Sequence, residues 1–178
     1  TLLPVSGLPE YLAQDSLRAI LLDKDGRVPE KPVPSDRDYR LKRPTPRSFD
    51  DCCNEFWNLS HYVARGICRE ALFYAARHLD LMREELFRML GWEAGFREGF
   101  SFSLGKQYRF LDRHMDPARW DALAGTYNLG SLSRVRAALG TCRELFSESS
   151  RRVAAALGCP YPDYEEKVSR YLDYYLKG

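Results

Sequence analysis

The sequence lacks the features that mark several classes of protein. Its five cysteines form no CxxC pair and no Cys/His metal spacing, and they fit reduced core residues of a cytoplasmic protein. No run approaches the ~18 apolar residues of a membrane span, and no signal peptide opens the chain. The net charge is only +2, with acids and bases interspersed, so a nucleic-acid partner is not expected. We therefore expect no membrane span and no metal ligands in this chain.

What is present is enough for one ordinary domain. The chain has 178 residues, of which 44% are hydrophobic, so it can bury a sizeable core. It opens at Thr1 without an initiator methionine, and we expect it to be a fragment of a longer protein.

Two regions differ in their pattern. Residues 1–47 contain a short apolar strand candidate, Arg18–Asp23, followed by an Asp-Gly pair in hairpin position. Five of the ten prolines fall between Pro29 and Pro46, which indicates a connector. From residue 48 to residue 178 the periodicity is helical. We predict a mainly α fold, a bundle of about five helices after a β-hairpin or extended lead-in.

The helix boundaries follow from capping residues and glycines. Ser48, with Asp51 three residues later, resembles a capping box. The predicted helices run from Phe49 to Arg69, from Glu70 to Leu90, from Asp116-Pro117 to Tyr127, from Ser131 to Gly158, and from Asp163 onward. Four glycines between Gly91 and Gly105 predict a loop-rich stretch between the second and third of these helices.

The first predicted helix carries a stripe of polar residues opposite its apolar face. At ~100° per residue the members fall within roughly an 80° arc. We call them the polar stripe: Asp51, Glu55, Asn58, Tyr62, Arg65 and Arg69. Carboxylates at its start and arginines at its end match the helix dipole, as on an ordinary solvated face. The functional alternative is a surface that binds a polycation at one end and phosphates at the other. Trp57 and His61 lie on its flank.

A second candidate is the segment Ser101–Phe110. Gly105 gives backbone freedom, Lys106 gives a point charge, and Tyr108 follows two residues later, which suits a phosphate. The segment is not a P-loop, because Gln107 follows the lysine. A plain loop with Tyr108 anchored in the core explains the same residues.

Several segments together resemble one family. These are Leu21–Pro29, the double-cysteine segment Phe49–Trp57, Tyr62–Gly66 and Gly99–Lys106. In this order they resemble the aminoglycoside 6-adenylyltransferases, the streptomycin-modifying enzymes, over nearly the whole chain. The resemblance implies a nucleotidyltransferase domain ending in residues 1–47 and a helical substrate-binding domain over residues 48–178, with the active site between them. It also implies transfer of AMP from Mg·ATP to the 6-hydroxyl of streptomycin, and hence antibiotic resistance.

The resemblance also implies roles for particular residues. The Mg²⁺ ligands of the family are a Gly-Ser motif with Asp-x-Asp and a third Asp, and the third Asp would fall just upstream of Thr1. Glu55 or Asp51 fits the helical-domain base of related nucleotidyltransferases, and Arg65 fits the residue that binds the triphosphate. Lys106 and Tyr108 are further nucleotide candidates. The implied drug contacts are Asp51, Glu55, Trp57, Asn58 and Tyr62.

Two hypotheses remain open from the sequence. The first is the acceptor- and triphosphate-binding part of an aminoglycoside adenylyltransferase, which needs its own N-terminal nucleotidyltransferase domain and is inactive alone. The second is a non-catalytic helical module that binds a cationic ligand or a partner protein.

Overall fold

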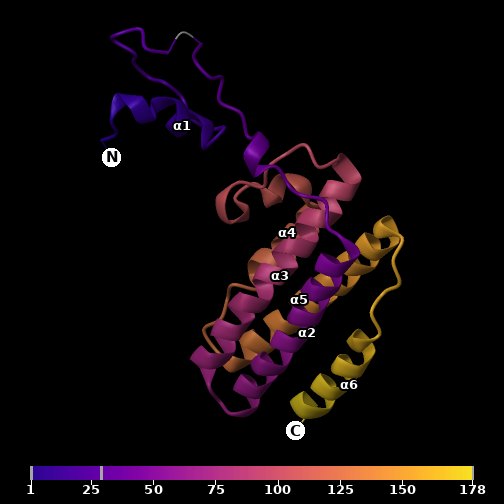
Figure 1. Ribbon diagram of the computed structural model, residues 1–178. Coiled ribbons are helices and arrows are strands. Elements are labelled where there is room, and N and C mark those ends of the chain that lie inside the picture. The colour runs from indigo at the N-terminus through magenta and orange to yellow at the C-terminus, as the bar shows by residue number, and fades with distance from the viewer. Residues whose placement is uncertain (1, 29, 178) are drawn as a thin grey trace.

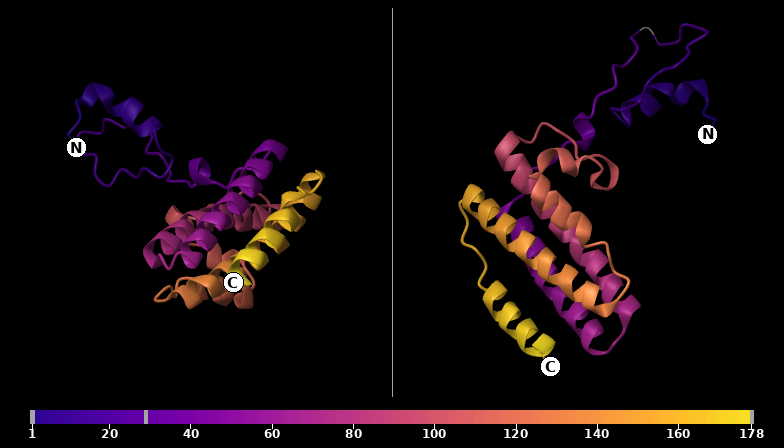
Figure 2. Two further views of the ribbon diagram at one scale, coloured as in Figure 1. Left: turned by 90° about the horizontal axis from the view of Figure 1, so that it is seen from below. Right: turned by 180° about the vertical axis from the view of Figure 1, so that it is seen from behind.

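The computed structural model describes residues 2–28 and 30–177, and the side chains of all of these except Lys177. Thr1, Pro29 and Gly178, which the predicted segments include, lie outside the described residues. The helices of the described residues are α1 (Leu8–Ala13), α2 (Pro46–Cys68), α3 (Leu72–Glu98), α4 (Pro117–Gly125), α5 (Leu132–Leu157) and α6 (Tyr164–Lys177). The last five form a bundle, and residues before α2 extend from one end of it (Figures 1 and 2). The predicted mainly α bundle is confirmed.

Helix α2 begins three residues before the predicted start. Thr45 and Ser48 form the capping box, in place of Ser48 and Asp51, and Pro46 occupies the first turn. The predicted apolar arc is buried: Phe56 and Val63 are both 0% exposed. Phe56 stacks on Phe146 of α5 with 3.6 Å between ring centroids. The α2 core residues therefore fix which face of the helix remains in solvent.

Helix α3 corrects the prediction that glycines end it near Leu90. It continues to Glu98 because Gly91 and Gly95 are buried positions where loop side chains pack onto the helix backbone. A Cβ added at Gly91 would lie 2.8 Å from Leu104 Cδ1, and one at Gly95 would collide with the Phe100 ring. These glycines permit close packing, whereas Gly99, with φ of 87°, ends the helix.

Helices α2 and α3 pack as an antiparallel pair joined by a tight turn. Gly66 lies so close to Ala75 that an added Cβ would sit 2.7 Å from the Ala75 Cβ. Near the other end of the pair, the Cys52 thiol donates to the Glu85 carbonyl at 3.5 Å. Residues near Gly66 and residues near Cys52 therefore mark opposite ends of the α2–α3 seam.

Helices α5 and α6 complete the bundle. Ser131 caps α5 and Gly158 ends it in the left-handed conformation, as predicted. Helix α6 runs parallel to α2, because the Tyr164 hydroxyl donates to the Asp50 carboxylate at 2.6 Å and Cys68 contacts the Tyr175 carbonyl at 3.4 Å. Leu172, 0% exposed, anchors α6 on the core.

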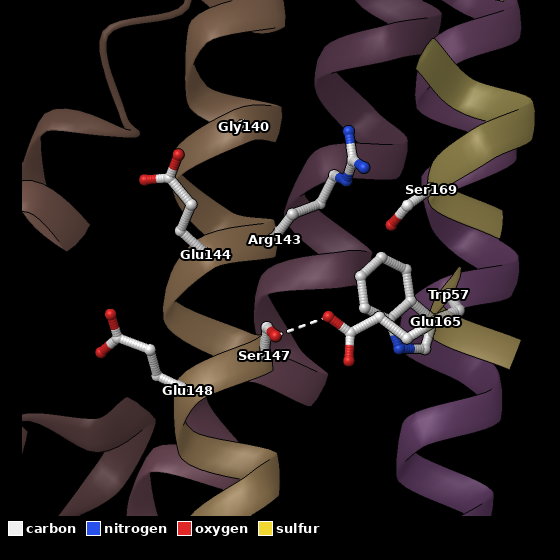
Figure 3. A pocket seen from close by; sticks show the side chains of 8 residues that line it. All are labelled: Trp57, Gly140, Arg143, Glu144, Ser147, Glu148, Glu165 and Ser169. Carbon is white, nitrogen blue, oxygen red and sulfur yellow. Dashed lines mark hydrogen bonds between the residues drawn. The ribbon is translucent and has the colours of Figure 1, made fainter. Parts of the chain in front are cut away.

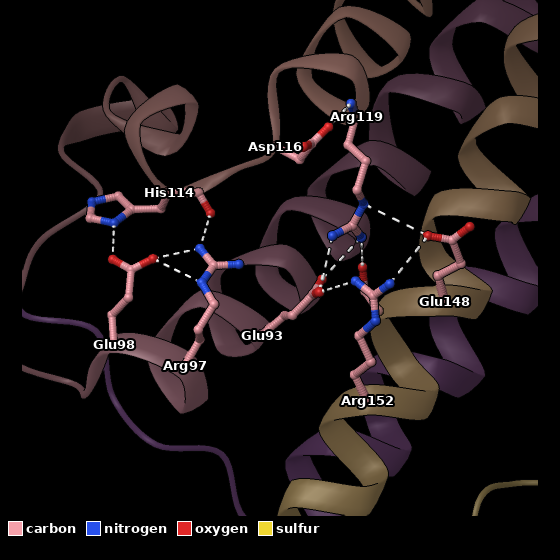
Figure 4. Close-up of polar contacts among 9 residues, drawn as sticks. Glu93, Arg97, Glu98, His114, Asp116, Arg119, Glu148 and Arg152 are labelled. Carbon is pink, nitrogen blue, oxygen red and sulfur yellow. Dashed lines mark hydrogen bonds and ion pairs between the residues drawn. The ribbon is translucent and has the colours of Figure 1, made fainter.

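A buried ion-pair cluster ties α3 to α4 and α5 (Figure 4). The two Glu93 carboxylate oxygens each accept a hydrogen bond from Arg119 at 3.0 Å. Arg152 donates to Glu93 at 2.5 Å, and Arg119 also donates to the Ser149 hydroxyl at 2.6 Å. Burial alone would raise the pKa of Glu93, but these hydrogen bonds outweigh it and lower the pKa to about 2. Glu93 therefore stays ionised inside the bundle.

The lead-in before α2 is extended but does not form the predicted strand at Arg18–Asp23. The described residues contain no strand. The Asp23 carboxylate instead accepts from the backbone of Arg27 and Val28, at 3.1 and 3.0 Å, and so closes a local turn around Gly26. A lone hairpin without a third strand or a helix against it is marginal in water, which accounts for its absence here.

The lead-in also exposes many apolar side chains. Leu21 is 96% exposed, Val33 86% and Leu2 fully exposed. Among the described residues, no helix is long and apolar enough to cross a membrane.

Candidate functional site

The polar stripe lies on the solvent-facing side of α2, as its periodicity predicts. Asp51, Glu55, Asn58, Arg65 and Arg69 are exposed. Tyr62 is the half-buried member, and its ring stacks on His78 of α3 at 5.2 Å between centroids. The stripe is thus an open surface along α2, flanked by α3 on one side and by α6 on the other.

The acidic end of the stripe gains carboxylates from α3. Burial raises the pKa of Glu85, and the nearby carboxylates of Glu55 and Glu84 raise it further, against the effect of Arg88. The contact between Cys52 and the Glu85 carbonyl places Glu85 one turn of α2 before Glu55, and the Glu85 carboxylate pairs with Arg88 at 2.8 Å. Asp51 adds a carboxylate one turn earlier, 3.8 Å from Arg47. Asp51 and Glu55 are the exposed acids of this end and can face a ligand with positive charges.

The α3 acids were missed from the sequence. Glu84 and Glu85 are adjacent on a helix that carries charges on most sides, so periodicity alone gives no reason to choose them. The antiparallel packing of α2 on α3 brings them to Glu55.

The basic end of the stripe forms one wall of a groove between α2 and α6. The groove has a volume of about 420 Å³. Its lining residues are Asn58, His61, Tyr62, Ala64, Arg65, Cys68 and Arg69 of α2 and Tyr171 and Tyr175 of α6. We call it the α2–α6 groove. The sequence did not indicate that the α6 tyrosines line this groove, because their position beside α2 depends on how α6 packs on the bundle.

On the side that faces α3, aromatic rings lie next to Arg65 of the polar stripe. The Arg65 guanidinium lies 5.6 Å from the Tyr62 ring centroid, within cation–π range. Tyr62 stacks on His78, whose Nδ1 lies 2.8 Å from the Tyr74 carbonyl oxygen. A carbonyl only accepts, so Nδ1 carries the proton in this contact. The pair His78 and Tyr62 therefore limits the directions that Arg65 can take.

Trp57 does not share the face of the polar stripe. It is 2% exposed and packs edge-on against Phe56 and Phe146. Its indole lines a different depression of about 410 Å³ between α5 and α6, which we call the α5–α6 groove (Figure 3). The prediction that Trp57 lies on the flank of the polar stripe is therefore wrong, because its ring is buried against the core aromatics on the other side of the helix from Asp51 and Glu55.

The segment around Lys106 lies at the other end of α2 from Arg65. The Tyr108 ring packs on Phe87 at 5.0 Å, and burial followed by the nearby Glu84 carboxylate raises its pKa. Phe87 lies two residues beyond Glu85, which contacts Cys52. At 1.5 Å per residue, Cys52 and Arg65 are about 20 Å apart along α2. The Lys106 segment therefore lies near the start of α2, whereas Arg65 lies near its end.

The Lys106 segment is held in an unusual backbone conformation. Gln107 and Tyr108 have positive φ of 55° and 58°, and Gly105 has 72°. A Cβ at Gly105 would lie 2.8 Å from the Phe110 ring, so this position requires glycine. Lys106 itself is exposed.

A catalytic Mg²⁺ does not fit the residues that the structure describes. Within residues 2–28 and 30–177, no three His, Cys, Asp or Glu side chains form a group that could hold a metal ion. The Asp23 carboxylate is occupied by the backbone of Arg27 and Val28, and Asp25 pairs with Arg27 at 3.0 Å. This Asp-x-Asp pair therefore serves a turn.

The chain is similar to known proteins over nearly its whole length. The family described as streptomycin adenylyltransferase matches residues 1–175. An aminoglycoside 6-adenylyltransferase of Campylobacter jejuni is 45% identical over 97% of this chain, and one of Bacillus subtilis (strain 168) is 41% identical over 97%. The crystal structure of an aminoglycoside 6-adenyltransferase from Bacillus subtilis superimposes with a TM-score of 0.73 at 34% identity, over 99% of this chain and 65% of that one.

The chain spans 60% and 62% of the lengths of the Campylobacter and Bacillus relatives. The family match runs from the lead-in through the bundle, over residues 1–175. The chain belongs to the streptomycin adenylyltransferase family.

Proposed function

We propose that these residues form the acceptor-binding part of an enzyme that transfers AMP from Mg·ATP to the 6-hydroxyl of a streptomycin-like aminoglycoside. The observation that carries the proposal is the polar stripe: in a chain of this family, acids and arginines share one open face of α2. In the whole enzyme this face borders the nucleotidyltransferase domain, which supplies the Mg²⁺ ligands. Attachment of AMP would inactivate the drug and so confer resistance.

The acidic end of the stripe is proposed to bind the drug. Streptomycin carries two guanidinium groups, which carboxylates bind through charge-assisted hydrogen bonds. Asp51 and Glu55 are exposed on one face of α2, one helical turn apart. Asn58 and Tyr62 follow on the same face and can bind sugar hydroxyls.

Glu55 is the proposed general base, with Asp51 as the neighbouring candidate. As the drug hydroxyl bonds to the α-phosphorus and pyrophosphate leaves, the hydroxyl proton passes to the carboxylate. Glu55 is exposed, and the only hydrogen bond it accepts among the described side chains is a long one of 3.5 Å from Asn58. Its oxygens are therefore available to a substrate.

The nucleotide is proposed to lie toward Arg65. Because about 20 Å of helix separates the levels of Cys52 and Arg65, Lys106 and Tyr108 are proposed to contact a different part of the substrates, on the side where the lead-in joins the bundle. The Leu41 amide donates to the Phe102 carbonyl at 2.9 Å, so the lead-in and the Lys106 segment are neighbours.

The lead-in, residues 1–47, is proposed to be the end of the nucleotidyltransferase domain and the linker to the bundle, packed on the rest of that domain. Its exposed Leu21, Leu22 and Val33 would otherwise leave apolar surface in water, which a folded neighbour would cover. Residues 48–178 are then the helical substrate-binding domain.

The first expected outcome concerns the 178-residue chain alone. Incubated with ATP, Mg²⁺ and streptomycin, it should release no pyrophosphate and form no adenylylated drug, because its described residues offer no metal site. Pyrophosphate release and mass spectrometry of the drug measure both products. Metal-dependent turnover by the pure chain would refute the division of labour between the two domains.

The second expected outcome tests the base in the whole enzyme. Glu55→Gln keeps the shape and removes the base, so kcat should fall by about 10²-fold or more. If Glu55 only binds the drug, KM for the drug should rise while kcat is preserved. Glu166→Gln, the same change at an exposed site on α6, is the control and should alter neither constant. Unchanged constants in Glu55→Gln would show that the stripe is only a solvated face.

A further inference from the structure

The α2–α6 groove combines two arginines with tyrosine rings, and none of its lining residues in the described part of the chain is Asp or Glu. Arg65 lies in the last turn of α2 and Arg69, four residues later, caps its C-terminus, and both line the groove. Among the described residues, neither arginine forms an ion pair with Asp or Glu. Two positive charges therefore remain for an anion in solution.

Helix α6 contributes the aromatic wall of the groove. Tyr171 and Tyr175 are four residues apart, and their ring centroids lie 4.6 Å from each other. The His61 ring of α2 lies 5.0 Å from Tyr171. Tyr171 and Tyr175 are 45% and 49% exposed, so each ring keeps a free surface. Half-exposed tyrosines can stack on a planar ring, and the arginines beside them can bind negatively charged groups attached to that ring.

The rest of the molecule shows that this absence of acids is not a general property of its surface. On the opposite side of α6, Asp173 pairs with Arg143 of α5 at 3.2 Å and Glu165 pairs with Arg151 of α5 at 2.9 Å. Both arginines there already have carboxylate partners. Arginines of the α2–α6 groove, within the described part of the chain, do not.

We infer that the α2–α6 groove is a nucleotide site, in which Arg65 and Arg69 bind phosphate oxygens and Tyr171 and Tyr175 stack on the base. The inference rests on the proposed function and extends it, because it assigns Arg69 and α6 to the nucleotide. Guanidinium groups bind phosphate through paired hydrogen bonds, and stacking on a base tolerates any purine or pyrimidine. The groove volume of about 420 Å³ is within the range of small-molecule sites.

Cys68 provides a probe inside the groove. It lines the groove and is exposed, whereas Cys52, Cys53 and Cys142 are buried. Burial raises the pKa of all three buried thiols, that of Cys142 to about 12, so they react slowly with thiol reagents. Cys159 is half-buried, and Cys159→Ser leaves Cys68 as the one accessible thiol among the described residues.

The experiment measures the rate at which a thiol reagent labels Cys68 in the 178-residue chain carrying Cys159→Ser. ATP should slow the labelling, with half-protection at a concentration about 10-fold lower than inorganic triphosphate requires, because only ATP has a base to stack. Arg69→Ala should weaken protection by both. In the double variant Tyr171→Leu/Tyr175→Leu, ATP should need the same concentration as triphosphate for half-protection of Cys68. Tyr174→Leu, at an 80% exposed position of the same helix outside the groove, is the matched control.

Three results would overturn the inference. The first is the absence of protection by millimolar ATP in a chain whose circular dichroism shows a folded bundle. The second is equal protection by ATP and triphosphate, and the third is an equal effect of Tyr174→Leu, since either shows that the nucleobase does not stack on Tyr171 and Tyr175. The proposed function can survive all three, because it depends on the loss of kcat in Glu55→Gln of the whole enzyme. Conversely, if ATP protects Cys68 and Glu55→Gln has normal kinetics, the groove is still a nucleotide site but Glu55 is not the general base.

Discussion

The two grooves beside α6 have similar volumes but use their charges differently. In the α5–α6 groove the Ser147 hydroxyl donates to Glu165 at 2.5 Å (Figure 3). Two of its charged groups pair with neighbours at its edge, Glu165 with Arg151 at 2.9 Å and Arg143 with Asp173 at 3.2 Å. In the α2–α6 groove the arginines have no carboxylate partner among the described residues. Charges paired within the fold contribute to its stability, and charges left unpaired on a concave surface are available to a ligand. The two kinds of groove should therefore respond to mutation in different assays.

The largest effect on stability is expected at Glu93, whose carboxylate is paired with arginines inside the bundle. Glu93→Gln should lower the free energy of unfolding by about 2–3 kcal/mol, because Arg119 and Arg152 lose their shared anion, and the partly exposed Arg152 moderates the loss. Urea unfolding followed by circular dichroism measures the change. Glu166→Gln removes an exposed pair on α6 and should stay within about 0.5 kcal/mol. Equal losses in both variants would show that the Glu93 cluster adds no special stability.

The same cluster predicts how stability depends on pH. The pKa of Glu93 is about 2 in the folded chain, below its ordinary value of 4.5. Its contribution is therefore fully present above pH 4.5 and is lost as pH falls toward 2. The difference of about 2–3 kcal/mol in unfolding free energy between wild type and Glu93→Gln should largely disappear across that window. A difference that stays constant from pH 5 to pH 2 would contradict the ionised, hydrogen-bonded Glu93.

Much of the fold follows from local sequence patterns. The apolar arc of α2, the caps at Asp116 and Ser131 and the end of α5 at Gly158 were predicted, because each depends on residues within one or two turns. The errors came from contacts distant in sequence. Gly91 and Gly95 suggested a loop, yet they stay helical because Leu104 and Phe100 pack on them.

The candidate site divides in the same way. The exposure of Asp51, Glu55 and Arg65 could be predicted, since one helix carries all three and its period fixes their common face. The partners could not, because they depend on which helices pack beside α2. Thus Glu84 and Glu85 of α3 and the tyrosines of α6 appear only in the structure, and so does the position of Trp57 on the far side of α2.

The most direct test compares one arginine from each groove in the whole enzyme. Arg65→Ala should raise KM for ATP by about 10-fold and KM for streptomycin much less, because it removes a phosphate contact. It should change the unfolding free energy by less than about 0.5 kcal/mol. Arg143→Ala should do the reverse: a loss of about 1 kcal/mol of stability, since Arg143 is mostly buried against Asp173, with KM for ATP unchanged. If both variants raise KM for ATP alike, or if Arg65→Ala weakens the drug and spares ATP, the distinction between paired and unpaired charges does not mark the nucleotide site.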